Sequence, residues 1–155
     1  KAAIDVNNDQ KTILYKKASK RLITFNGLKV AVLGLTFKPG TDDLREAPSL
    51  ENVPLLLEQG AEIYAYDPVG IKNFMRKYPE GTYSKGSIKY VRNIQEALAG
   101  ANVCFIFTEW NEIKAVQPKE YKTLMRTPLV YDGRNIYVVE AMKEAGVEYY
   151  SIGRK

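Results

Sequence analysis

The residues best suited to chemistry lie in one stretch, 34–49, which directly follows the apolar run 29–33. The stretch opens with Gly34, carries Lys38, two adjacent aspartates and Arg45, and ends in a Pro-Ser pair typical of a helix start. A loop of this kind between a strand and a helix presents backbone N–H groups and cations to a ligand. Such groups bind anions, and phosphate is the ligand that we expect there.

Two further polar turns follow predicted strands. One is 108–111, with the sequence Thr-Glu-Trp-Asn, and the other is 132–135, with Asp-Gly-Arg-Asn. The carboxyl ends of parallel strands lie along one edge of a sheet, so these turns and the first loop are expected to converge on one crevice. Gly133 permits a tight bend that exposes Arg134, whose guanidinium fork suits a phosphate or a carboxylate. A surface arginine paired with Asp132 is the alternative.

The other polar residues of these loops each have two interpretations. Lys38 follows Phe37, and an aromatic ring beside an ammonium can pack against a ligand while the charge meets a phosphate or hydroxyl. A solvated lysine is the alternative. Arg45 lies near two aspartates, either to position a ligand or in an exposed ion-pair cluster that stabilises the loop. Glu109 and Trp110 are equally open, although a tryptophan at a strand end more often packs than stacks on a base.

The first loop lacks the glycine pattern of a dinucleotide-binding turn. Thr36 and Pro39 occupy positions where the G-x-G-x-x-G pattern requires glycines. Their side chains block the close approach of a pyrophosphate to the backbone. A mononucleotide or a nucleotide sugar therefore fits this loop better than a complete NAD molecule.

The chain contains no histidine and a single cysteine, Cys104. This composition excludes Ser-His and Cys-His nucleophile pairs, thiolate zinc sites and an internal disulfide. Cys104 lies in the most apolar predicted strand, 103–107, which indicates a buried structural thiol and not a nucleophile. If the chain belongs to an enzyme, we expect the reacting groups on a part of the protein outside this sequence.

At 155 residues, with 45% apolar side chains, the chain suits one domain with an ordinary core. Its net charge of +5 fits an anionic partner, but the scattered lysines and arginines argue against nucleic acid. No apolar run approaches the roughly 20 residues of a membrane span, and no signal-like start is visible. We therefore expect a cytoplasmic protein with no membrane contact. Because the sequence begins with Lys1, we also expect it to be part of a longer chain.

Hydrophobic spacing predicts a helix followed by alternating strands and helices. The predicted helices are 2–22, 48–59, 71–78, 94–99, 120–125 and 138–145, and the predicted strands are 30–33, 63–67, 103–107, 129–131 and 148–152. Segment 79–89, rich in glycine, serine and lysine, is predicted to be an exposed loop. The alternation predicts an α/β fold, a Rossmann-like parallel sheet with helices on both faces, preceded by an N-terminal helix.

Four motifs together carry a resemblance to a known family. They are 34–49 (GLTFKPGTDDLREAPS), 65–68 (AYDP), 108–110 (TEW) and 132–135 (DGRN). With them the chain closely resembles the C-terminal UDP-binding domain of UDP-glucose 6-dehydrogenases, over nearly its whole length. The first motif is specific to nucleotide-sugar dehydrogenases, although Ala47 stands where many relatives have serine. On this resemblance, 1–26 would be a helix continuing from a central segment and 27–155 would be the UDP-sugar-binding domain.

The resemblance implies an enzyme that uses NAD to oxidise the C6 alcohol of UDP-glucose to a carboxylate, through an intermediate bound to a cysteine. In the family, that cysteine and the G-x-G-x-x-G cofactor domain precede the part that this chain resembles. The chain alone is therefore expected to be inactive, with NAD bound mainly by the N-terminal domain of the same polypeptide, and the intact enzyme a homodimer that supplies polysaccharide precursors. The alternatives are the same domain of a GDP-mannose or UDP-N-acetylhexosamine dehydrogenase, and a noncatalytic nucleotide-binding module.

Matched by motif to the family, Phe37 and Lys38 would contact the nucleotide sugar, and Arg134 would help to hold it. Arg45 would reach across the cleft to the NAD of the other domain. The resemblance places no catalytic group and no metal ligand on this chain.

Overall fold

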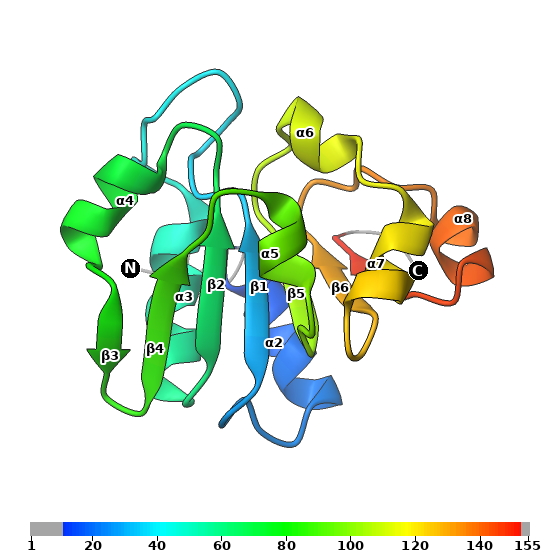
Figure 1. Cartoon of the computed structure of the whole chain (residues 1–155), viewed down its shortest axis with the longest axis horizontal. Coiled ribbons are helices and arrows are strands. Elements are labelled where there is room, and N and C mark those ends of the chain that lie inside the picture. The colour runs from blue at the N-terminus through cyan, green and yellow to red at the C-terminus, as the bar shows by residue number, and fades with distance from the viewer. Residues whose placement is uncertain (1–10, 153–155) are drawn as a thin grey trace, which may run out of the picture.

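The computed structural model describes residues 11–152, which form a seven-stranded sheet with helices on both faces (Figure 1). In chain order the elements are α2 (Ile13–Arg21), β1 (Lys29–Leu33), α3 (Pro48–Glu58), β2 (Glu62–Tyr66), α4 (Ile71–Lys77), β3 (Gly81–Tyr83), β4 (Gly86–Tyr90), α5 (Ile94–Leu98), β5 (Val103–Ile106), α6 (Asn111–Lys114), α7 (Pro118–Leu124), β6 (Leu129–Asp132), α8 (Val139–Glu144) and β7 (Glu148–Ser151). The predicted α/β fold with a helix before the sheet is confirmed. The part of that helix predicted before residue 11 lies outside the described residues.

The strands follow the order β3-β4-β2-β1-β5-β6-β7, and every neighbouring pair is parallel except β3 and β4. From β1 the chain runs outward on one side and then returns to β5 on the other, so the carboxyl ends of β1 and β5 border the switch point, where ligands bind in such sheets. The chain segments that follow β1 and β5 lie very close together. A Cβ on Gly34, whose φ is 94°, would lie 2.6 Å from the backbone nitrogen of Thr108.

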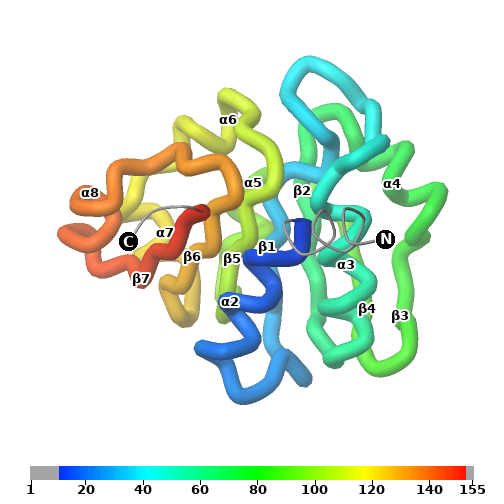
Figure 2. Tube along the Cα trace, turned by 180° about the vertical axis from the view of Figure 1, so that it is seen from behind, coloured from blue at the N-terminus to red at the C-terminus, as the bar shows by residue number. Residues whose placement is uncertain are grey.

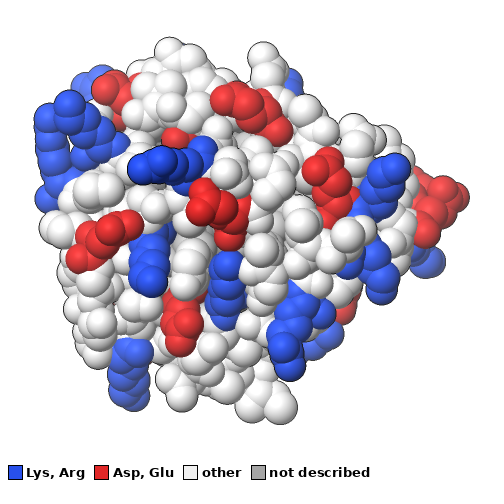
Figure 3. Space-filling view, viewed as in Figure 1, with Lys and Arg blue, Asp and Glu red and all other residues white. Residues whose placement is uncertain are grey.

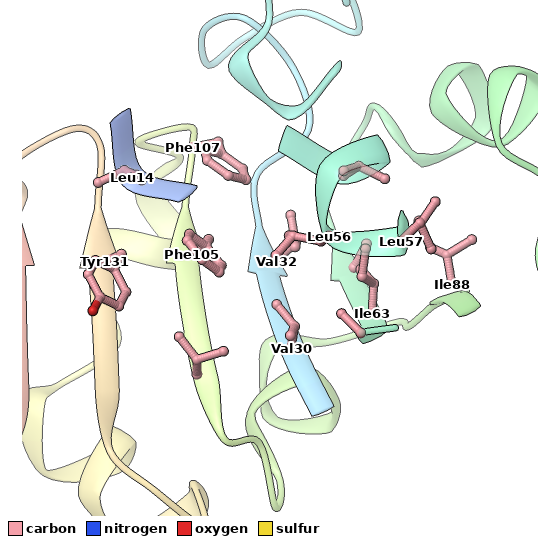
Figure 4. Packing of buried hydrophobic residues seen from close by; sticks show 14 of the residues in the cluster. Leu14, Val30, Val32, Leu56, Leu57, Ile63, Ile88, Phe105, Phe107 and Tyr131 are labelled. Carbon is pink, nitrogen blue, oxygen red and sulfur yellow. The ribbon is translucent and has the colours of Figure 1, made fainter. Parts of the chain in front are cut away.

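The side chains of β1 alternate between two cores. Val30 and Val32 pack with α2, α3 and α4, whereas Ala31 and Leu33 pack with α5, α6, α7 and α8. Figure 4 shows Val30 and Val32 in the first of these cores, together with Leu56 of α3. Figure 2 shows α2 and α3 from behind, on the face of the sheet opposite α5 and α7. A strand covered on both faces must be apolar throughout, which explains the uninterrupted run that predicted it.

Several helix starts have identifiable local causes. Pro48 occupies the first position of α3, where its missing N–H costs nothing. The side chain of Asn93 accepts a hydrogen bond of 2.8 Å from the backbone N–H of Glu96 at the start of α5. At α7, the backbone N–H of Gln117 donates to the carboxylate of Glu120 at 2.8 Å, as part of a capping box.

The predicted exposed loop at 79–89 is wrong. These residues form β3 and β4, a hairpin whose second strand pairs in parallel with β2 and buries Ile88 completely. Gly86 lies where a Cβ would approach the carbonyl oxygen of Ala61 to 2.6 Å, so this glycine serves close packing and not flexibility. The amino-acid composition of this segment led to the wrong prediction because its pairing with β2 is a tertiary contact, which outweighs the local conformational preference of the residues. The short helix α6 was not predicted either.

The surface mixes charges of both signs. On the face in Figure 3, basic and acidic side chains are interspersed, so the net positive charge does not form one continuous stripe there. Among residues 11–152, no helix is long and apolar enough to cross a membrane.

Candidate functional site

A hollow of about 310 Å³ lies where β1, β5 and β6 end. Its lining includes Phe37, Glu46, Phe107 and Arg134, and on the α2 side Lys11 and Leu14. We call it the Arg134 hollow. Phe37 and Arg134, which come from turns almost a hundred residues apart, are therefore brought together, as the convergence of strand ends predicts. Lys38 is not part of the lining.

The guanidinium of Arg134 bridges the turns after β1 and β5. Its Nε donates to the carbonyl oxygen of Phe107 at 2.9 Å, and one terminal nitrogen donates to the carbonyl oxygen of Phe37 at 2.5 Å. Nε also lies 3.5 Å from Oε1 of Glu109, which accepts no hydrogen bond within the described chain. An arginine has five N–H groups, and these two bonds leave three for a ligand. The alternative, a guanidinium paired with Asp132, is not the arrangement found.

Asp132 instead shapes the backbone of its own turn. The carboxylate is fully buried and accepts hydrogen bonds from the N–H groups of Arg134 at 2.7 Å and Ile136 at 2.8 Å, and from the hydroxyl of Tyr149 at 2.6 Å. The left-handed residue of the turn is Asn135, with φ of 55°. Asn and Asp tolerate this conformation better than other residues with a side chain.

The loop after β1 presents its two predicted contacts differently. Phe37, a residue that is 42% exposed, lines the Arg134 hollow, and its backbone N–H donates to the carbonyl oxygen of Asp43 at 3.1 Å. Lys38 is exposed, and within residues 11–152 its ammonium makes no hydrogen bond or ion pair. Lys38 is therefore solvated, and it follows Phe37, which lines the hollow.

Arg45 lies away from these residues. Its Nη2 is 2.9 Å from Oδ2 of Asp43, and its side chain is 89% exposed. Because Arg45 donates hydrogen bonds to the carboxylate, the pKa of Asp43 falls to about 2. The pair borders a separate depression of about 660 Å³ between the loop and α4, where Arg76 and Lys77 lie. The ion-pair interpretation of Arg45 is thus the one found, and a contact with NAD stays a prediction.

An ion pair of Lys11 with Glu46, which was not predicted, borders the Arg134 hollow. The ammonium of Lys11 lies 2.7 Å from Oε1 of Glu46, which lowers the pKa of that carboxyl. Glu46 has φ of 66°, a conformation that residues with side chains seldom adopt. The partners are 35 residues apart, so no local spacing could have revealed the pair.

Trp110 and Cys104 are packed in the interior. The indole N–H of Trp110 donates to Oδ2 of Asp67 at 3.0 Å and the residue is 9% exposed, so the packing interpretation holds. Cys104 is fully buried, and burial raises the pKa of its thiol. The predicted burial of this thiol is confirmed, and its purely structural role stays a prediction. In the part of the chain that the structure describes, no group of three or more acidic, histidine or cysteine side chains is placed to hold a metal ion.

A model of the UDP-glucose/GDP-mannose dehydrogenase family, UDP binding domain, matches residues 31–139. The chain belongs to this family. The matched range runs from β1 to the start of α8 and contains Phe37, Lys38, Arg45 and Arg134. The resemblance stated from the motifs is therefore confirmed.

Members of the dehydrogenase family resemble the whole of this chain. UDP-glucose 6-dehydrogenase YwqF of Bacillus subtilis is 43% identical over 155 residues, which are all of this chain and 34% of that protein. UDP-glucose 6-dehydrogenase of Rhizobium meliloti is 44% identical over 128 residues, 83% of this chain and 28% of that protein. The structure of a UDP-glucose dehydrogenase from Pyrobaculum islandicum has a TM-score of 0.75 at 31% identity, over 96% of this chain and 31% of that one. The chain thus spans about a third of the length of these relatives.

The cofactor of such dehydrogenases can be tested against the loop after β1. In a dinucleotide-binding turn, backbone N–H groups face the pyrophosphate. Here the N–H groups of Leu35 and Thr36 donate to Oδ2 of Asp67, at 2.7 and 3.3 Å. Because a carboxylate already occupies these donors, this turn of the UDP-binding domain does not fit NAD.

Proposed function

We propose that this chain holds the nucleotide sugar of an NAD-dependent UDP-glucose 6-dehydrogenase, which oxidises UDP-glucose to UDP-glucuronate in successive steps at C6. The observation that carries the proposal is the guanidinium of Arg134, which borders the hollow with three N–H groups unused by the described protein. The choice of reaction is supported by the relatives, which are named UDP-glucose 6-dehydrogenases.

Three residues would hold the ligand. Arg134 would donate charge-assisted hydrogen bonds to the diphosphate or the ribose, since a guanidinium suits oxygens paired in a plane. The exposed ring of Phe37 would pack against the ligand body. Lys38, whose ammonium makes no hydrogen bond or ion pair within the described residues, would supply a compact positive charge to a phosphate or hydroxyl.

The remaining chemistry would lie outside this chain. We place NAD mainly on the N-terminal domain of the same polypeptide, where it would accept hydride from the substrate, with Arg45 as a contact across the cleft. The nucleophilic cysteine would lie there too, so residues 27–155 would act as the substrate-binding domain, with 1–26 as the helix that joins it to the rest. On this proposal the chain alone is inactive, and the intact enzyme is a cytoplasmic homodimer.

Calorimetric titration of the 155-residue chain tests ligand binding. We expect saturable binding of UDP-glucose and UDP that is weak, because one side of the cleft is missing, and weaker binding of GDP-mannose. Arg134→Met should weaken UDP-glucose binding about 10- to 100-fold, the cost of charge-assisted hydrogen bonds. Arg126→Met is the matched control, because Arg126 is exposed near the opposite end of β6.

Two outcomes would redirect the proposal. Tighter binding of GDP-mannose than of UDP-glucose would favour a GDP-mannose dehydrogenase, and UDP-N-acetylhexosamines are tested in the same way. Absence of saturable heat at millimolar ligand, from a folded sample, would contradict nucleotide-sugar binding. A full-length protein that binds UDP-glucose but reduces no NAD would be a noncatalytic nucleotide-binding module.

A further inference from the structure

The two residues that precede Phe37 have all four of their backbone polar groups bound by buried side chains. The N–H groups of Leu35 and Thr36 donate to Oδ2 of Asp67. The carbonyl oxygen of Leu35 accepts a hydrogen bond of 2.6 Å from the hydroxyl of Ser49, and that of Thr36 accepts one of 2.5 Å from the hydroxyl of Thr108. Ser49 and Thr108 are fully buried and Asp67 is 2% exposed. We call these three side chains the clamp.

Asp67 accepts more hydrogen bonds than those from Leu35 and Thr36, and the additional donors lie in other turns. Its Oδ1 accepts hydrogen bonds from the N–H groups of Val69 at 2.9 Å and Gly70 at 2.6 Å, where α4 begins. Its Oδ2 also accepts from the indole of Trp110, in the turn after β5. Gly70 is required by this crowding, because a Cβ there would lie 2.5 Å from Cγ2 of Thr36. One carboxylate thus joins the ends of β1, β2 and β5.

Only a carboxylate fits these surroundings. Asp67 meets five N–H donors, and an ionised carboxylate offers acceptors on both oxygens and no donor. An asparagine would turn an NH2 group toward some of these donors. Burying a charge is costly unless hydrogen bonds compensate it, so the five donors are what keep this carboxylate in place. Since both oxygens are used and the residue is buried, Asp67 does not itself touch a ligand.

We propose that Asp67 is a positioning residue for the nucleotide-sugar site. It fixes Leu35 and Thr36, so the next residue, Phe37, is held with its ring at the hollow and its carbonyl oxygen against Arg134 before any ligand arrives. A loop that had to be ordered at each binding event would lose affinity, because ordering costs conformational entropy. The inference rests on the proposed function of the Arg134 hollow.

The test is Asp67→Asn in the full-length dehydrogenase that contains this chain. We expect the KM for the nucleotide sugar to rise about 10- to 100-fold, as charge-assisted hydrogen bonds are lost, while the KM for NAD stays within about twofold. Amide hydrogen exchange should quicken at Leu35 and Thr36 and remain unchanged in the strands. A control for general destabilisation is Val103→Ala, which removes buried methyl groups from β5 away from the clamp.

Thr108→Val provides a second variant if Asp67→Asn does not fold. It removes one hydroxyl and keeps the shape, so we expect a rise of about 3- to 10-fold in the KM for the nucleotide sugar, with the same selectivity over NAD. An unchanged KM in folded Asp67→Asn would overturn the proposal. So would an equal rise in both KM values, or the same selective rise in Val103→Ala.

Failure of the positioning role can be told apart from failure of the proposed function. The wild-type enzyme is first assayed with UDP-glucose, GDP-mannose and UDP-N-acetylhexosamines, and the KM comparison uses the sugar that it accepts. If it accepts none, the proposed function fails, and amide exchange in Asp67→Asn still shows whether Asp67 orders the loop. If it accepts one and exchange at Leu35 and Thr36 is unchanged, only the positioning role fails.

Discussion

The turns after β1 and β6 are both organised by a buried aspartate, but over different distances in the sequence. Asp132 accepts the N–H groups of residues two and four positions further on, within its own turn. Asp67 accepts those of Leu35 and Thr36, more than 30 residues earlier, and the indole of Trp110, 43 residues later. The turn after β6 is therefore defined by local sequence, and the turn after β1 only by the assembled sheet.

Because the two aspartates bind different numbers of donors, we expect their removal to lower the free energy of unfolding by different amounts. These are the largest effects that we predict. Asp67→Ala leaves five N–H donors without their acceptor and should lower the free energy of unfolding by about 3–5 kcal/mol. Asp132→Ala leaves two N–H groups and one hydroxyl and should cost about 2–3 kcal/mol. Urea denaturation of both variants measures the two losses. Equal losses, or a larger one for Asp132→Ala, would remove the distinction between the turns.

The same comparison extends to ligand binding in the intact enzyme. Arg134→Met removes the proposed ligand contact together with the bridge to the carbonyl oxygens of Phe37 and Phe107, so the KM of the proposed dehydrogenase for UDP-glucose should rise about 100-fold. Lys38→Met removes a solvated ammonium and should raise the KM about 10-fold. Steady-state kinetics at saturating NAD measures the KM of each variant and shows which substitution has the larger effect. If Lys38→Met has the larger effect, the β1 turn supplies more of the binding than the β6 turn.

The outer part of the β1 turn is predicted to respond to pH as a local pair. Arg45 lowers the pKa of Asp43 to about 2, so their pairing stabilises the fold above the ordinary carboxyl pKa and is lost as the pH falls from about 4 through 2. Carboxyl NMR titration should find the Asp43 midpoint near 2, and a higher midpoint in Arg45→Gln, where the guanidinium is gone but the backbone N–H of residue 45 still donates to the carboxylate. If the Asp43 midpoint in Arg45→Gln equals that of the wild type, the pairing is contradicted.

Cys104→Ser should have the smallest effect on activity. The thiol lies within β5, on the face away from α2, and belongs to neither turn. A buried hydroxyl in its place should cost about 1–2 kcal/mol of stability, which thermal unfolding measures, and should leave turnover in the intact enzyme nearly unchanged. A collapse of turnover in the folded variant would mean that the assignment of this thiol as structural is wrong.

Much of the fold was predictable because its signals are local. β1 and β5 are uninterrupted apolar runs, and α3 has its starting proline and its buried stripe within 11 residues. The β3–β4 hairpin was missed because its identity depends on pairing with β2, which no short window contains.

Likewise, one part of the candidate site could be predicted from the sequence and another part could not. Parallel strands and their polar ends were enough to bring Phe37 and Arg134 together. The pair of Lys11 with Glu46 and the clamp around Leu35 and Thr36 join distant segments, and their residue types are ordinary at each position. Asp67 was noted in the motif 65–68, but its five N–H donors come together only once three strands are aligned.

The crowding at Gly34 sets a rule for protein engineering. Because a side chain there would collide with the main chain at Thr108, the connection after β1 cannot be replaced alone by one borrowed from a distant protein. A graft that aims to change nucleotide preference would have to carry the connection after β5 with it, as a single exchangeable cassette.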